Sequence, residues 1–188
     1  DTRIIPQLSG DSPLGRGWKD YMAQERGSGL VRLISDFERK PKQGNILIMR
    51  HSARDHAGVF IYRSQDTIFE NVNIFTAAGL GFLGQYSENI TLKNSNVMPN
   101  YAKGRYLCGH ADGFQVSNCR GDILVDGCKF EGLMDDPINV HGTCVKIIEL
   151  KGRRSIVCKF MESMSTGMTW GGVEDKVGFL ENRSMATL

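Results

Sequence analysis

The sequence predicts an all-β fold, a right-handed parallel β-helix (a solenoid) with a C-terminal β-hairpin segment. Three observations predict it. Short apolar runs recur at an interval near 23 residues, each repeat carries Asn or Gly at a fixed turn position, and the helical half of a leucine-rich repeat, whose period is similar, is absent. Coils of short strands that stack in parallel about 4.8 Å apart account for all three.

The repeat is clearest in three aligned segments. Each has an apolar residue, a spacer, Asn or Gly, two spacers and a second apolar residue, with one position of slack in the first: Ile68–Ile74, Leu92–Val97 and Val125–Phe130. Asn71 and Asn94 are 23 positions apart, whereas Asn94 and Gly127 are 33 apart because an insertion lies around residues 101–109. Asn tolerates a left-handed turn and Gly adopts one without cost, so we expect the turn of each coil there.

In chain order we expect three regions. These are an irregular segment at 1–29, a parallel β-helix core carrying the site at 30–144, and at 145–188 a hairpin with the start of a further, truncated region. Strand-like runs open the core at Leu30–Ile34, Asn45–Arg50 and Val59–Tyr62. The partner strands of the repeat are predicted at Gly58–Tyr62, Gly81–Leu83, Gly113–Val116 and Pro137–Val140. A hairpin is predicted by two later runs, Val145–Leu150 and Ser155–Phe160.

Composition excludes several classes of function. The 188 residues are 40% hydrophobic and 23% charged, as in an ordinary globular protein. The formal net charge of +2 lacks the basic excess that a nucleic-acid partner requires, and no run of about 18 apolar residues could span a membrane. A neutral substrate fits this charge balance better than a polyanion.

Two motifs that suggest other functions have plainer explanations. The five cysteines include no CxxC pair, so we expect no zinc site and mostly buried free thiols, with a Cys119–Cys128 bridge left open. Residues 79–84 spell GxGxxG, but a turn and strand of the repeat follow where a dinucleotide site needs a long helix. These glycines are expected to form tight corners.

Three acids carry the candidate chemistry: Asp112, Asp135 and Asp136. The second and third follow the first by 23 and 24 residues, one repeat, so we expect stacked neighbours. Stacked carboxylates repel, and one of them should have a raised pKa. This is costly as structure but useful in glycoside hydrolysis, where one acid holds a proton while another stays ionised. The alternatives are an Asp ladder that caps turns and a calcium site of the oxygen-ligand type.

Other polar residues are expected around these acids. In the strand after Pro137, alternation turns Ile138 and Val140 inward and Asn139 and His141 outward, beside the acids. Gln115 would be their neighbour on the previous coil. A separate polar cluster at 51–56, which includes His51 and Arg54, is either a hydrogen-bonded surface loop or a rim of the substrate pocket.

Several motifs together resemble glycoside hydrolase family 110. The string from Asp135 to Thr143, DDPINVHGT, is the most specific. Four shorter segments support it in order along the chain: Arg50–Ser52, Gly79–Gln85, Gly104–Tyr106 and His110–Gly113. The likeness runs from about Leu30 to Phe160.

The resemblance implies a right-handed parallel β-helix with additional β-rich domains and an exo-acting α-1,3-galactosidase. The substrate would be an oligosaccharide or glycoconjugate ending in α-galactose, blood-group-B-like or linear. The family inverts configuration and uses no metal, so we expect no cofactor. It implies secretion or a periplasmic location, is compatible with a homodimer, and makes this chain a portion of a larger protein.

Carried over by motif, the catalytic acids are Asp112, Asp135 and Asp136. Our hypothesis makes Asp135 the general acid. Asp112 and Asp136 would hold the attacking water and deprotonate it. The expected substrate-binding residues are His141, Asn139, His110, Arg105, Gln85, His51 and Arg54. Trp170 is a candidate for stacking on the sugar, with a contact in the core or to another domain as the alternative.

Two other classes share these features. A β-helix polysaccharide lyase would use calcium-binding acids and a basic proton acceptor. A non-catalytic glycan-binding β-helix would bind sugar without turnover, although repelling carboxylates serve binding poorly.

Overall fold

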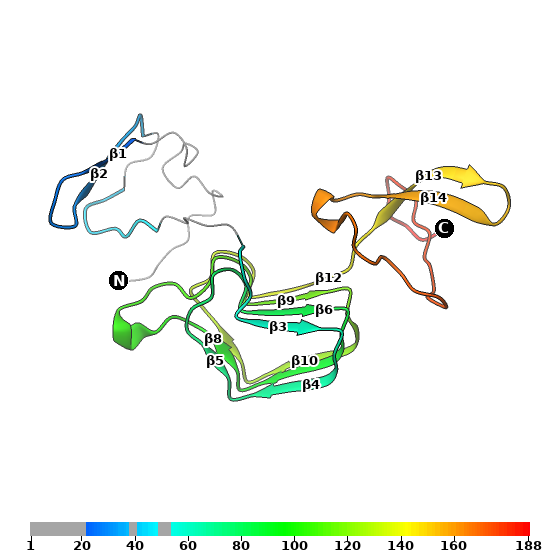
Figure 1. The fold of residues 1–188 in the computed structure, drawn as a ribbon, viewed down its shortest axis with the longest axis horizontal. Coiled ribbons are helices and arrows are strands. Elements are labelled where there is room, and N and C mark those ends of the chain that lie inside the picture. Colours follow the sequence, from blue (N-terminus) through cyan, green and yellow to red (C-terminus); the bar gives the residue numbers. More distant parts are fainter. Residues whose placement is uncertain (1–21, 38–40, 49–53) are drawn as a thin grey trace. The chain divides into compact units, whose positions relative to one another are not determined.

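The computed structural model describes residues 22–37, 41–48 and 54–188. The chain divides into two compact units, one up to residue 53 and the other from Arg54 to Leu188, and each is treated by itself. The second unit contains a parallel β-helix, which confirms the predicted fold class (Figure 1). No helix among the described residues is long and apolar enough to cross a membrane.

Three parallel sheets form the walls of the β-helix. The longest wall has the order β12-β9-β6-β3 and consists of β3 (Val59–Tyr62), β6 (Phe82–Gln85), β9 (Phe114–Ser117) and β12 (Ile138–His141). The second wall consists of β4 (Gln65–Glu70), β7 (Glu88–Lys93) and β10 (Arg120–Asp126). The third consists of β5 (Asn73–Ile74), β8 (Asn96–Val97) and β11 (Lys129–Phe130). Each predicted partner strand is found, with bounds that differ by one residue at most, except that β6 ends two residues later than predicted.

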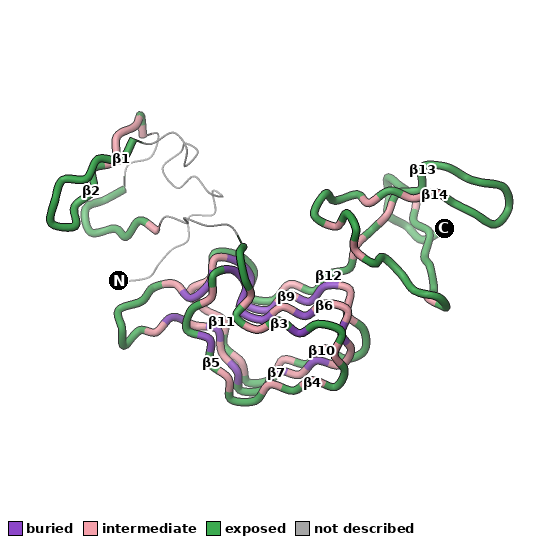
Figure 2. The backbone as a smooth tube through the Cα atoms, in the orientation of Figure 1, coloured by how far each residue is buried: buried purple, intermediate pink, exposed green. Residues whose placement is uncertain are grey.

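Buried residues occur along each of the three walls (Figure 2), and they form one hydrophobic core cluster. Phe82 and Phe114, successive residues of one row, are fully buried and meet edge to face with ring centroids 6.2 Å apart. Phe69 from the second wall packs on Phe82 at 5.5 Å. Burying each such ring stabilises the fold by about 1.5–3 kcal/mol. At Gly113 a Cβ would lie 2.7 Å from a backbone oxygen, so close packing of the coils requires glycine there.

Left-handed turns occur at the predicted positions. Asn71, Asn94 and Gly127 have φ of 59°, 47° and 61°. A second corner has the same conformation in three coils, at Asp66, Asn89 and Gly121. A third corner has it at Arg63, Tyr86 and Asn118. The insertion carries the 3-10 helix η2 (Tyr101–Lys103) and leaves the coils on either side in register.

The cysteines of the β-helix hold turns rather than forming bonds to one another. Cys119 Sγ accepts from Ser87 N at 3.4 Å, and Cys128 Sγ accepts from Ser95 N at 3.4 Å. The Cys119–Cys128 bridge is not formed, because the two thiols belong to different corners. All five cysteines are free, and burial raises the pKa of the Cys108 thiol to about 11.

The first unit differs from what was predicted. The run at Leu30–Ile34 forms β2 (Val31–Ile34), but β2 pairs antiparallel with β1 (Met22–Glu25) around a Gly27–Gly29 turn of positive φ. It is therefore half of a hairpin and not a coil, and part of the segment expected to be irregular is a strand. The strand predicted at Asn45–Arg50 is wrong for residues 45–48, and its last two residues lie outside the described ranges. The boundaries at 29/30 and 144/145 stay predictions.

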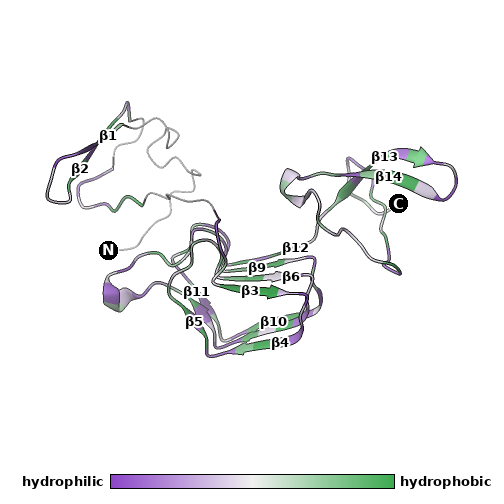
Figure 3. Ribbon diagram, viewed as in Figure 1, coloured by the Kyte–Doolittle hydropathy of each residue, from purple (hydrophilic) through white to green (hydrophobic). Residues whose placement is uncertain are grey.

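The C-terminal hairpin is confirmed. β13 (Val145–Lys151) pairs antiparallel with β14 (Ser155–Phe160), and a short 3-10 helix η3 (Ser163–Ser165) follows. Figure 3 shows that β3 is hydrophobic along most of its length. Its outward residues Phe60 and Tyr62 are exposed, so the first wall presents aromatic side chains outside as well as inside.

Candidate active site

Adjacent coils place the three acids together at one end of the first wall. Asp112 stands two residues before β9, and Asp136 two residues before β12. Gly81 N donates to Asp112 O and Gly113 N to Asp136 O, both at 2.9 Å, so Asp136 occupies the position next to Asp112 on the neighbouring coil. The spacing of one repeat therefore predicted the stacking correctly.

The carboxylates form a tight cluster. One oxygen from each of Asp112, Asp135 and Asp136 lies within 4.8 Å of the others. Among the described residues this is the group whose ligand atoms are close enough to hold a metal ion. Carboxylate oxygens suit a hard cation such as Ca²⁺, and the same closeness suits acids that share a proton.

Asp112 is the buried member of the cluster. Its side chain is 1% exposed, and Leu80 holds the equivalent position one coil earlier. Asp112 Oδ2 accepts from Asn139 Nδ2 at 3.2 Å. Its Oδ1 is buried and accepts no hydrogen bond from the part of the chain described. A buried oxygen without a partner is costly for a carboxylate and favours the protonated form.

Burial raises the pKa of Asp112 above its ordinary value. The charge of Asp135 raises this pKa further, and that of Asp136 adds a smaller increase. The Arg54 guanidinium and the Asn139 hydrogen bond act in the opposite direction but do not cancel the rise. Among the three acids, Asp112 is thus the one whose surroundings favour the protonated form.

Asp135 has the opposite environment. It forms an ion pair and a short hydrogen bond with Arg54, both side chains being partly exposed. Its Oδ1 also accepts from Asp136 N at 3.2 Å. Arg54, predicted as a residue of the pocket rim, is thereby brought to the acids from 81 positions away. His51, its companion in that prediction, lies outside the described residues.

The strand β12 presents its polar residues as predicted. Ile138 and Val140 pair in register with the buried Phe114 and Val116, which places them on the inner row. They are nonetheless 41% and 61% exposed, because β12 is an edge strand of its sheet. The outer row of β12 therefore belongs to Asn139, the partner of Asp112.

His141 is held by two contacts. Its Nε2 lies 2.8 Å from Gln115 Nε2, and its Nδ1 lies 3.0 Å from Gly142 O. An amide nitrogen only donates, so His141 Nε2 accepts and the proton is on Nδ1. Gln85 belongs to the same row, two strands away through Ser117. Gln115, which orients the imidazole, was predicted only as a neighbour, because its contact depends on side-chain geometry.

The remaining predicted ligands are dispersed. His110 lies in the turn before β9, and its backbone N donates to Gly79 O at 3.1 Å. Arg105 lies in the inserted loop and makes no hydrogen bond or ion pair with the three acids within the described ranges. Trp170 lines a cavity at the other end of the strands rather than the acid cluster.

Comparison with known proteins agrees with this architecture. A family model described as a right-handed beta helix region matches residues 35–151. The chain is 46% identical to alpha-1,3-galactosidase B of Bacteroides thetaiotaomicron, an alignment covering 100% of this chain and 31% of that protein. It is 38% identical to alpha-1,3-galactosidase B of Parabacteroides distasonis (98% and 30% covered) and 34% identical to alpha-1,3-galactosidase A of Bacteroides fragilis (90% and 29% covered). The chain spans about a third of the length of these relatives.

Proposed function

We propose that the solenoid of this chain, which belongs to the family of right-handed β-helix proteins, is the scaffold of a glycosidase that removes terminal α-1,3-linked galactose. The relatives named alpha-1,3-galactosidase support this reaction, and they bear the name that the resemblance to family 110 implied. The observation that carries the proposal is the cluster of Asp112, Asp135 and Asp136, in which one acid is buried and the others are exposed.

The environments support a division of roles that differs from the initial hypothesis. Asp112 donates the proton to the glycosidic oxygen, because it is the acid whose pKa is raised. Asp135, paired with Arg54, faces the positive charge that develops on the sugar. Asp136 takes a proton from the attacking water. The bond between C1 and the glycosidic oxygen breaks. The leaving sugar keeps that oxygen as a hydroxyl with the proton from Asp112, and the galactose takes the water oxygen at C1.

Inversion is part of the proposal. Inverting enzymes separate their carboxyl groups by roughly 6.5–9.5 Å to admit a water, whereas the closest oxygens here lie within 4.8 Å. Asp136 is exposed and its side chain makes no hydrogen bond or ion pair with another described residue. It is therefore free to rotate away from Asp112 when substrate and water enter.

The wider biological setting is proposed on the resemblance alone. The substrates are blood-group-B-like glycans or linear chains that end in galactosyl-α-1,3-galactose. The protein acts outside the cytoplasm, secreted or periplasmic, and assembles as a homodimer. Gel filtration and cell fractionation test these two points.

The test is the replacement of each acid by Asn, assayed for galactose release from galactosyl-α-1,3-galactose. Proton NMR of the first-formed galactose determines the stereochemistry. Initial β-galactose supports inversion, and initial α-galactose contradicts it. Normal kcat in folded Asp112→Asn and Asp135→Asn would overturn the catalytic assignment. Cleavage that stops with a chelator and leaves an unsaturated product would indicate a lyase, and binding without cleavage a glycan-binding module.

A further inference from the structure

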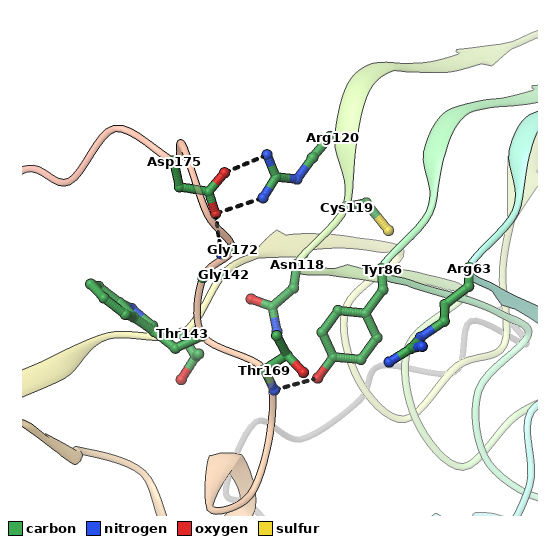
Figure 4. A pocket seen from close by; sticks show the side chains of 12 residues that line it. Arg63, Tyr86, Asn118, Cys119, Arg120, Gly142, Thr143, Thr169, Gly172 and Asp175 are labelled. Atoms are coloured by element: carbon green, nitrogen blue, oxygen red, sulfur yellow. Dashed lines mark hydrogen bonds and ion pairs between the residues drawn. The ribbon is translucent and has the colours of Figure 1, made fainter.

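A cavity opens at the opposite ends of the same strands. Its volume is about 600 Å³, within the roughly 300–1,000 Å³ of small-molecule sites. The floor comes from the turns after β3, β6, β9 and β12, and the wall comes from the segment 169–175 (Figure 4). Its lining includes Arg63, Tyr86, Asn118 and Trp170.

The composition of this corner departs from the rest of the β-helix. At the other two corners the left-handed turn is made by Asn, Asp or Gly, which tolerate it. Here the turn is made by Arg63, Tyr86 and Asn118, with φ of 49°, 51° and 53°. The first two are bulky residues for which this conformation costs of order 1–3 kcal/mol, and such residues concentrate at ligand sites.

The side chains of this corner form an ordered aromatic surface. Tyr62 and Tyr86 meet edge to face at 5.9 Å, and the Arg63 guanidinium lies 5.3 Å and 6.0 Å from their ring centres. Trp170, 41% exposed, lines the same cavity. Aromatic rings with exposed faces are suited to the apolar faces of sugars, and the arginine supplies donors for hydroxyl oxygens.

Asn118 supplies an unused donor. Its Nδ2 is buried and has no hydrogen-bond partner in the described part of the chain, while its backbone N donates to His141 O at 3.1 Å. A buried amide without an acceptor costs about 1–3 kcal/mol, so a rotation of this side chain toward an occupant's oxygen would recover that energy.

The wall of the cavity is anchored at two points. Both terminal nitrogens of Arg120 donate to the Asp175 carboxylate at 2.7 Å. Thr169 N donates to the Tyr86 hydroxyl at 3.1 Å. The Arg120 hydrogen bond is the main reason that the pKa of Asp175 is lowered to about 2. The two anchors hold Trp170 over the strand ends.

The outer face of the first wall joins the cavity to the acids. Asp112 and Asn118 are six residues apart along one extended strand, or roughly 20 Å at the usual rise. Between them this face carries Gln115, Asn139 and His141. A glycan whose terminal galactose sits at the acids would pass these polar residues and reach the cavity several sugars further on.

We propose that this cavity is a subsite for a neutral sugar residue of the substrate beyond the cleaved galactose, stacked on Trp170 and Tyr86 and hydrogen-bonded by Asn118. This inference rests on the proposed galactosidase function. It assigns the cavity to the chain that leaves rather than to the galactose released.

The first experiment compares two substrates that end in the same α-1,3-linked galactose. These are the disaccharide galactosyl-α-1,3-galactose and an N-acetyllactosamine oligosaccharide that carries the same terminal galactose. The wild type should cleave the longer one with a kcat/KM roughly tenfold higher, because the longer chain gains a stacking contact and a hydrogen bond in the cavity. Trp170→Ala and Asn118→Asp should each reduce this ratio toward one. Phe179→Ala, which removes an aromatic of similar exposure outside the cavity, should keep it.

The second experiment separates this inference from the proposed function. The N-acetyllactosamine chain without its galactose is titrated calorimetrically into the wild type and the same variants. Binding that weakens about tenfold in Trp170→Ala and Asn118→Asp but not in Phe179→Ala supports the subsite even if neither substrate is cleaved. No binding by the wild type, or equal binding by all variants, overturns it. If the wild type cleaves both substrates with equal kcat/KM, the inference is overturned as well.

Discussion

The two ends of the first wall use one repeat in opposite ways. At the acid end, Asp112 takes an inner position that Leu80 holds one coil earlier. At the other end, Arg63 and Tyr86 take turn positions that Asn, Asp or Gly holds at the other corners. One end buries a carboxyl group and the other strains a backbone. In both, the departure from the repeat costs stability and marks the surface that we assign to substrate.

The largest expected effect is on catalysis at the acid end. Asp112→Asn should lower kcat by roughly 10²–10⁴, the usual contribution of a general acid. On an aryl galactoside with a good leaving group the loss should be much smaller, since less proton donation is needed. Asp126→Asn is the matched control, an exposed acid of the β-helix. An equal loss on both substrates would remove the acid role from Asp112.

The second prediction concerns stability at the same residue. Asp112→Leu restores the side chain of the preceding coil, so it should raise the free energy of unfolding at neutral pH by about 1–3 kcal/mol while abolishing activity. Urea unfolding at pH 7 measures this change. A destabilised Asp112→Leu would show that the row accommodates the carboxylate better than its burial indicates.

The third prediction is the pH dependence of stability. The pKa of Asp112 is raised in the folded state, so the native protein holds a proton that the unfolded chain has lost. This group's contribution to stability is therefore full below the unfolded pKa and falls as pH rises through the folded pKa. Asp112→Asn should flatten that decline in a series of melts, and Asp126→Asn should leave it in place.

The fourth prediction tests Arg54. Its charge lowers the pKa of Asp112, so Arg54→Ala should raise that pKa and move the alkaline limb of the kcat/KM profile to higher pH. Arg54→Lys should restore most of the original position because it keeps the charge. An unmoved limb in Arg54→Ala would mean that Asp112 does not control it.

The smallest effect is expected at the strained corner. Arg63→Asn keeps a polar side chain that tolerates positive φ, so it should stabilise the protein by about 1 kcal/mol. Thermal melts measure this gain, and Arg153→Asn in the exposed hairpin turn serves as the control. No gain at Arg63 would show that its stacking on Tyr62 and Tyr86 compensates the strain.

Some elements could not be predicted, for a common reason. The strand pairing of β2 depended on β1, whose four residues carry no clear strand pattern. The Arg54–Asp135 pair spans 81 positions, and the Thr169–Tyr86 contact that closes the cavity spans 83. Neither pair has a signal in local sequence, since side chains so distant meet only after the coils have stacked.

The sequence was sufficient to predict the solenoid, the left-handed turn at Asn71, Asn94 and Gly127, and the stacking of Asp136 on Asp112, because a repeat of fixed length also sets the register of its coils. The tertiary structure alone decided which acid is buried, which is paired with Arg54, and where Trp170 lies. Those outcomes depend on the dielectric surroundings and on long-range side-chain contacts, and a repeat interval specifies neither.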